Sequence, residues 1–163
     1  SDDSAQISVV LATLGAELGL AKQFSDDLSA IALKKSQDQN RNYAFLILSA
    51  IDSSRSVETA LILVRQGDFA VITSVDDPVY RDLTKRLTPA DREKLVTDFL
   101  ALAKDSKVWA DRENELLGYL KMFAATQGWP NHLQAGLKDI ESKHTSEYIR
   151  EYAVKAREKQ VQS

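Results

Sequence analysis

The residues with the clearest metal-binding spacing are Glu141 and His144, in the stretch ESKH. A Glu-x-x-His spacing places a carboxylate and an imidazole on one face of a helix, as in di-iron helical bundles. Those bundles need two such pairs and two further glutamates, but the chain has only two histidines and no glutamate three residues before His132. We therefore expect no metal and no other cofactor, and we keep Glu141 and His144 as the alternative metal pair.

The densest cluster of side chains suited to recognition is the stretch WPNH, from Trp129 to His132. Tryptophan is enriched at binding hot spots, and a histidine beside it can titrate near neutral pH. A structural interpretation competes, in which Trp129 holds the turn after Gly128 and His132 lies in the first exposed turn of a helix. We take Trp129 and His132 as candidate binding residues. Together with His144 they define an alternative small-molecule or metal site.

A third candidate consists of Arg41, Tyr43 and Arg55, which lie at the edges of predicted helices around the stretch DSSRS. Two arginines near a helix N-terminus could hold a phosphate or a carboxylate, because the backbone amides and the helix dipole there favour anions. No glycine-rich loop accompanies them, so ordinary surface arginines are the competing interpretation.

The motifs of the common enzyme chemistries are missing. The sequence contains no phosphate loop, no G-x-G-x-x-G, no H-E-x-x-H and no G-x-S-x-G. It also has no cysteine, which excludes zinc–thiolate sites, iron–sulfur clusters and disulfides. A formal charge of −3 argues against a general nucleic-acid binder. These absences favour a protein that is not an enzyme, although a triad with members distant in sequence stays open.

The stretch ISVVLATLGAELGLAK, residues 7–22, governs how the other elements must be arranged. It is too short for a membrane span and contains Glu17, and Asp2 and Asp3 stand where a signal peptide would be basic. Wound as a helix, it is apolar on almost every side, which predicts a buried helix at the centre of a soluble bundle. Its smallest side chains share one strip and predict a helix-packing seam, made of Ser8, Ala12, Gly15 and Gly19.

Residues 59–73 leave the fold class open. The runs TALILV and FAVIT, separated by RQGD, are rich in β-branched residues and fit a short hairpin. They also fit a helix that stops at Gly67 and a second helical segment after it. Helical patterns on both sides and the marginal stability of a lone hairpin favour helices. We therefore predict an all-α bundle of about eight helices around the N-terminal helix, with an α+β fold as the alternative.

Capping signals predict where several helices begin. Ser25, before two aspartates, is the expected N-cap of a helix. Thr88 and Asp91 form a near relative of the capping box. The last helix is expected to begin near Thr145 or Ser146. Its apolar positions are predicted to face the core, namely Tyr148, Ile149, Tyr152 and Ala156.

No repeat or linker divides the sequence, so we predict one domain, residues 1–163, long enough to bury about two thirds of its unfolded surface. The sequence begins at Ser1 rather than at a methionine. This favours an exported, periplasmic protein whose leader has been removed, with a cytoplasmic location as the alternative.

Three function classes follow. The first, which we favour, is a non-enzymatic helical protein that binds another protein, as an adaptor, a toxin-neutralising partner or a periplasmic accessory factor. The second is a domain that binds a small molecule or metal, an enzyme included, near Trp129, His132 and His144. The third is a homo-oligomer held by the small-residue seam. We expect neither nucleic acid nor a membrane as a partner.

Overall fold

The computed structural model describes residues 6, 9–10, 13, 21–36 and 38–162. Every regular element within these ranges is helical, with eight α-helices, two short 3-10 helices and no strand. The prediction of an all-α fold is therefore confirmed. The hairpin alternative is wrong, because residues 59–73 form the end of α4 (Ser53–Arg65), a turn and the 3-10 helix η1 (Phe69–Ile72).

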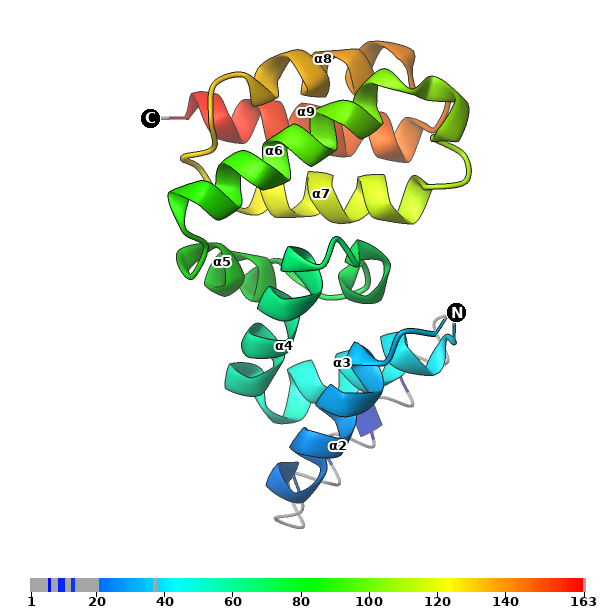
Figure 1. The fold of residues 1–163 in the computed structure, drawn as a ribbon, viewed down its shortest axis with the longest axis vertical. Helices are drawn as coiled ribbons and strands as arrows, with labels where there is room; N and C mark the ends of the chain where they lie inside the picture. Colours follow the sequence, from blue (N-terminus) through cyan, green and yellow to red (C-terminus); the bar gives the residue numbers. More distant parts are fainter. Residues whose placement is uncertain (1–5, 7–8, 11–12, 14–20, 37, 163) are drawn as a thin grey trace. The chain divides into compact units, whose positions relative to one another are not determined.

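The contacts divide the chain into two compact units, residues 1–79 and residues 80–163. Helix α5 (Asp77–Lys85) contains the boundary between them (Figure 1). Each unit buries apolar side chains of its own. The single domain expected from the sequence stays a prediction.

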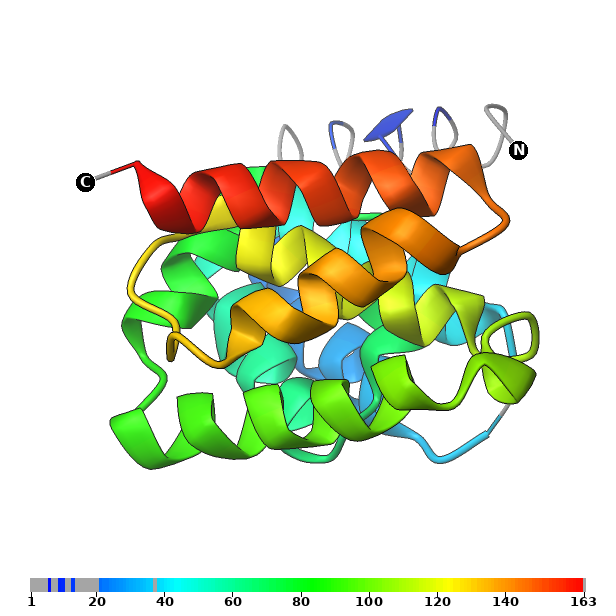
Figure 2. The same ribbon diagram turned by 90° about the horizontal axis from the view of Figure 1, so that it is seen from above.

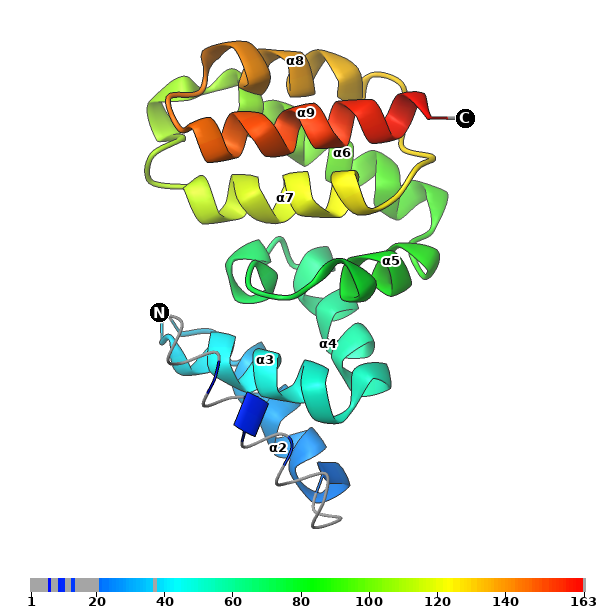
Figure 3. The same ribbon diagram turned by 180° about the vertical axis from the view of Figure 1, so that it is seen from behind.

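The first unit is built from α2 (Ala21–Leu33), α3 (Asn40–Ile51), α4 and η1. Helix α3 lies beside α2 and also contacts α4 and η1 (Figures 1 and 3). Its core consists of apolar side chains from all four elements, among them Ala32, Phe45, Leu48, Leu63, Phe69 and Ile72.

The end of α4 explains why a helix forms where a hairpin was conceivable. Leu63 and Val64 are buried while Ile62 is 42% exposed, a helical rather than an alternating pattern. Gly67 has a φ of +76°, and the amides of Gly67 and Asp68 donate to the carbonyls of Val64 (3.0 Å) and Leu63 (2.9 Å). These two bonds form a Schellman motif, so the predicted stop at Gly67 is confirmed.

The second unit contains α6 (Pro89–Lys104), η2 (Ser106–Val108), α7 (Glu113–Ala125), α8 (Leu133–Lys143) and α9 (Glu147–Val161). Successive α-helices from α6 to α9 run in opposite directions (Figures 1 and 3). Figure 2 shows α8 lying between α6 and α9, and it contacts both. Helix α9 also packs along α7.

An aromatic cluster fills the core of the second unit. The rings of Phe99 and Phe123 meet edge to face with centroids 5.1 Å apart, and Phe123 meets Trp129 in the same way at 4.8 Å. Gly136 of α8 lies against this cluster, where an added Cβ would stand 2.5 Å from Leu100 Cδ2 and 3.0 Å from Phe99 Cε1. An alanine at this position would force the end of the Leu100 side chain and the Phe99 ring to shift.

Gln160, near the end of α9, closes the end of α7. Its side-chain amide nitrogen donates to the carbonyls of Phe123 (2.8 Å) and Thr126 (3.0 Å). Carbonyls in the last turn of a helix have no partner within the helix, so this residue supplies a cap from a different helix.

The predicted caps of α6 and α9 are confirmed. Thr88 and Asp91 exchange both hydrogen bonds of a capping box, and the hydroxyl of Ser146 accepts from the amide of Ile149 at 3.4 Å. The prediction for Ser25 is wrong, because this residue lies inside α2 and is 5% exposed.

The predicted inner face of α9 is partly wrong. Tyr148 is 50% exposed and Tyr152 is half-buried, whereas Ile149, Ala153 and Ala156 are fully buried. The helix therefore presents isoleucine and two alanines to its neighbours, and their small size lets α9 lie close to α7 and α8. Tyrosines spaced by four residues fit a core-facing stripe, but the buried face of α9 is the neighbouring one, with Ile149, Ala153 and Ala156.

The N-terminal stretch 7–22 falls largely outside the described residues, and so do all four residues of the predicted seam. Val9 and Val10, which are described, are 57% and 55% exposed. The central buried helix and self-association through the seam stay predictions. In the part of the chain that is described, no helix combines the length and the apolar character needed to cross a membrane.

Candidate functional site

A hollow of about 530 Å³ lies in the second unit, between the start of α6 and the turn that joins α7 to α8. It includes most of the WPNH stretch singled out in the sequence. We call it the Trp129 hollow and define it by its lining residues, which are Leu87, Pro89, Arg92, Glu93, Gly128, Trp129, Pro130 and Asn131.

Trp129 forms the floor of the hollow and is only 6% exposed. Its ring packs against Phe123, and its indole nitrogen donates to the hydroxyl of Thr126 at 3.1 Å. Because the polar group of the indole is satisfied and most of the ring is covered, Trp129 is held rigidly and serves the core as well as the hollow.

Arg92 shapes one wall of the hollow, and its donors point to the protein's own backbone. The guanidinium lies over the indole of Trp129, with Cζ 4.9 Å from the ring centroid. Nη1 donates to the carbonyls of Gln127 (3.2 Å) and Gly128 (3.1 Å), and Nη2 donates to that of Thr84 (3.0 Å). Arg92 thus ties the end of α5 and the turn after α7 to α6, rather than presenting a cation to a ligand.

The rim carries the side chains that can still form new hydrogen bonds. His132 Nε2 lies 3.4 Å from a carboxylate oxygen of Glu93, and these side chains are 49% and 60% exposed. Asn131 is exposed and also lines the hollow. A carboxylate, an amide and an imidazole at a solvent-exposed rim can form directional hydrogen bonds with a partner.

The structure separates the residues of the alternative metal site. His132 and His144 stand at opposite ends of α8, whose 11 residues span about 16 Å. The carboxylate of Glu141 accepts from Arg157 Nε (2.7 Å) and Nη2 (3.2 Å). His144 is buried and stacks on Trp109 with ring centroids 5.2 Å apart. No group of three metal-ligating side chains occurs among the residues that are described.

Arg41, the first member of the predicted anion site, is 9% exposed and binds groups of its own unit. Its Nε and Nη1 donate to the carbonyls of Ala32 (3.0 Å) and Ser36 (2.9 Å), and Nη2 pairs with the carboxylate of Asp68. Asp68 directly follows the glycine that stops α4. Arg41 therefore fastens the connection between α2 and α3 to the end of α4.

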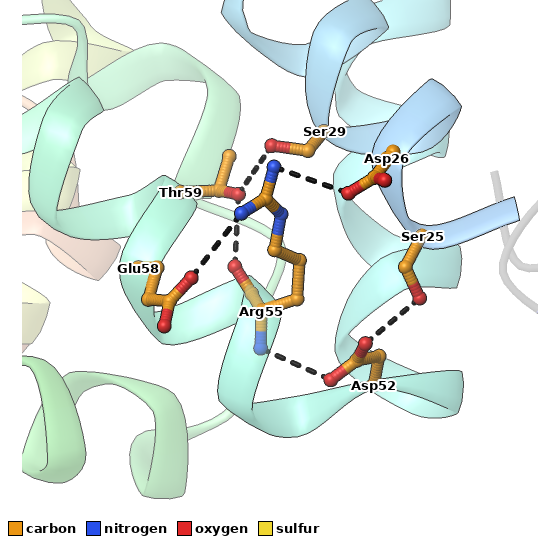
Figure 4. Close-up of polar contacts among 7 residues, drawn as sticks. All are labelled: Ser25, Asp26, Ser29, Asp52, Arg55, Glu58 and Thr59. Carbon is orange, nitrogen blue, oxygen red and sulfur yellow. Dashed lines mark hydrogen bonds and ion pairs between the residues drawn. The ribbon is translucent and has the colours of Figure 1, made fainter. Parts of the chain in front are cut away.

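Arg55 lies in a different polar network, between α2 and α4 (Figure 4). Its guanidinium is 3.3 Å from carboxylates of both Asp26 and Glu58. Its amide donates to Asp52 at 3.1 Å, so the first residue of the DSSRS stretch is the N-cap of α4. Tyr43, on α3, is 37% exposed. Arg41 and Arg55 share no contact partner in the described structure, and each already faces carboxylates of this chain.

The same network explains the position of Ser25. Its hydroxyl donates to the second carboxylate oxygen of Asp52 at 2.8 Å, and Ser29 shares a buried hydrogen bond of 2.7 Å with Thr59 (Figure 4). Ser29 and Ser25 of α2 thus contact α4 and its N-cap residue. A local capping pattern does not reveal these contacts.

Trp129 of the hollow stands out by its residue type in the sequence, whereas Arg92 and Glu93 do not. Arg92 and Glu93 lie about 36 residues before Trp129, and nothing local to α6 marks them as its neighbours. A proline beside each segment, Pro89 and Pro130, was the one shared signal. Comparison of the chain with family models, curated proteins and solved structures finds no match.

Proposed function

We propose that the protein is a non-enzymatic helical binding protein, and that a segment of another protein contacts it at the Trp129 hollow. The observation that carries this proposal is the composition of the hollow. Leu87, Pro89 and Pro130 line the hollow beside the mostly buried ring of Trp129. The polar side chains of Arg92, Glu93 and Asn131 complete the lining. A buried aromatic ring beside apolar residues, with polar groups around it, is a common arrangement in protein interfaces.

The directions of the polar groups favour a macromolecular ligand over a small one. In sites for small molecules, polar side chains converge on the ligand inside the pocket. Here the guanidinium of Arg92 is turned to backbone carbonyls, and the carboxylate of Glu93 and the imidazole of His132 are half-exposed. The groups that remain for recognition therefore point outward, where they suit an extended surface.

A site-specific cross-linking experiment tests the proposal. A photoreactive phenylalanine analogue replaces Asn131 at the rim and, in the matched control, Lys104 at the exposed end of α6. We expect a cross-linked partner from native-source extract at position 131 and none at position 104. Glu93→Lys should abolish the adduct at 131 if the rim carboxylate takes part. Equal labelling at both positions, or labelling at neither, would contradict binding at the hollow.

A second candidate, a small-molecule site, is favoured by the volume of the hollow, which lies within the range of ligand pockets. Native mass spectrometry of protein purified from its source distinguishes the two. A bound compound that is lost in Asn131→Ala, without a protein adduct at position 131, would favour the second candidate.

A further inference from the structure

His144 is the one histidine of the chain that the structure buries. It is 4% exposed, follows the last residue of α8, and lies three residues before Glu147, the first residue of α9. Its ring stacks on the indole of Trp109 with an angle of 21° between the planes. The imidazole therefore lies at the junction of η2, α8 and α9, away from the Trp129 hollow.

The hydrogen bonds of His144 fix its protonation state. The amide of Ser146 donates to Nδ1 at 3.0 Å, so Nδ1 must carry a lone pair. The proton of the neutral ring is then on Nε2, which is buried and has no hydrogen-bond partner. An imidazolium has a proton on both nitrogens, so it cannot accept the Ser146 amide.

The residue that makes this bond also starts α9. The hydroxyl of Ser146 accepts from the amide of Ile149, and its carbonyl accepts from that of Arg150 at 3.1 Å. The Arg150 guanidinium donates to the carbonyls of His144 (2.7 Å) and Thr145 (2.9 Å). A change at His144 is thereby passed to the first turn of α9 through one residue.

The charged groups that act on the ring are few. Glu113 of α7 favours the charged imidazole, and Arg150 of α9 disfavours it. Trp109, which follows η2 and stacks on the ring, carries no charge. Burial is the largest influence and lowers the pKa of His144 below its ordinary value. Stacking on the indole by itself would favour the cation, so a pKa found below the ordinary value would mean that burial outweighs stacking.

We propose that His144 makes the junction of α8 and α9 a pH-sensitive switch, in which protonation breaks the bond to the Ser146 amide and opens the first turn of α9. At neutral pH the ring is uncharged and the turn is closed. In mildly acidic solution the ring gains a proton that the closed geometry cannot accommodate.

Nuclear magnetic resonance of the full chain tests the switch, because only two imidazoles give signals. The His144 signal should titrate below the ordinary histidine range. Protection of the Ile149 and Arg150 amides against hydrogen exchange, corrected for intrinsic rates, should fall about fivefold or more between pH 7.5 and 5.

Two matched variants separate the switch from a general acid effect. The amide oxygen of His144→Asn can accept from Ser146 without titrating, so protection should become independent of pH. His132→Asn should keep the response of the unaltered chain. A His144 signal that titrates at its ordinary pKa, or equal protection at both pH values in the unaltered protein, overturns the proposal even if His144→Asn does not fold.

Discussion

The two units hold their helices together by different means. Of eight polar or charged residues that are buried in the described structure, six belong to the first unit: Ser25, Ser29, Arg41, Ser56, Thr59 and Thr73. The second unit buries only Thr84 and His144 among its described residues, and it contains the aromatic cluster of Phe99, Phe123 and Trp129.

This difference has energetic consequences. A buried hydrogen bond adds little net stability, but removing one partner leaves the other without water or protein to bind. The stability of a packed core depends instead on side-chain volume, and it falls when atoms are either added or removed. We therefore expect the first unit to be sensitive to loss of polar groups and the second to be sensitive to added or removed carbon atoms.

The largest expected effect is in the first unit. Arg41→Met keeps most of the side-chain volume but leaves the Ala32 and Ser36 carbonyls and the Asp68 carboxylate without their cation. We expect a loss of about 3 kcal/mol in the free energy of unfolding, measured by urea denaturation followed by circular dichroism.

Arg86→Met, at an exposed position, is the control and should change stability by less than about 0.5 kcal/mol. Both tryptophans lie in the second unit, so their fluorescence reports on that unit alone. If Arg41→Met shifts the fluorescence transition as much as the dichroism transition, the chain unfolds as the single domain predicted from its sequence.

The next effect tests volume in the second unit. Gly136→Ala places a methyl group 2.5 Å from Leu100 and 3.0 Å from Phe99, so we expect a loss of about 2 kcal/mol. Leu100→Ala in the same chain should recover part of that loss, measured as a coupling energy in a double-mutant cycle. Additive losses would mean that α8 shifts away from α6 instead of clashing with it.

A smaller effect is expected at the hydrogen bond between Ser29 and Thr59. Ser29→Ala should lower the free energy of unfolding by about 1 kcal/mol, because the two hydroxyls are buried against each other at 2.7 Å. The same substitution at an exposed serine of α4, Ser54→Ala, is the control and should be nearly neutral in the same urea titration. A neutral Ser29→Ala would show that this hydrogen bond adds nothing to the stability of the contact between α2 and α4.

The smallest expected effect is a dependence of stability on pH that is confined to the second unit, since both histidines lie there. The folded state lowers the pKa of His144, so the unfolded chain binds the proton more readily. Stability is thus complete above about pH 6.5 and falls as the pH drops below it. Tryptophan-detected melting at pH 7.5 and pH 5.5 measures the difference. An unchanged melting temperature would contradict it.

The sequence predicted features that depend on neighbours within one helical turn. The capping box of Thr88 with Asp91, the stop at Gly67 and the start of α9 at Ser146 are all local, and the structure has each of them. The all-α fold follows from the same short-range patterns, because apolar residues at helical spacing place one apolar face on each segment.

Features set by distant segments were not predictable. Ser25 fits a local capping pattern, but its hydroxyl bonds to Asp52, which is 27 residues away. No local pattern marks Gly136 as a neighbour of Phe99. At the candidate site, Trp129 and His132 were found by residue type, whereas Arg92 was missed because its partners in the turn after α7 are more than thirty residues away. Arg41 and Arg55 had the right chemistry for anions, but the carboxylates nearest to them belong to this chain.

The cap that Gln160 supplies to α7 has a consequence for synthesis of the chain. Helix α7 leaves the ribosome before α9, yet two carbonyls at its end meet their donor only when Gln160 has been added. The first unit, residues 1–79, has been made in full by then. A stalled nascent chain that ends before Gln160 should therefore leave the end of α7 open to solvent.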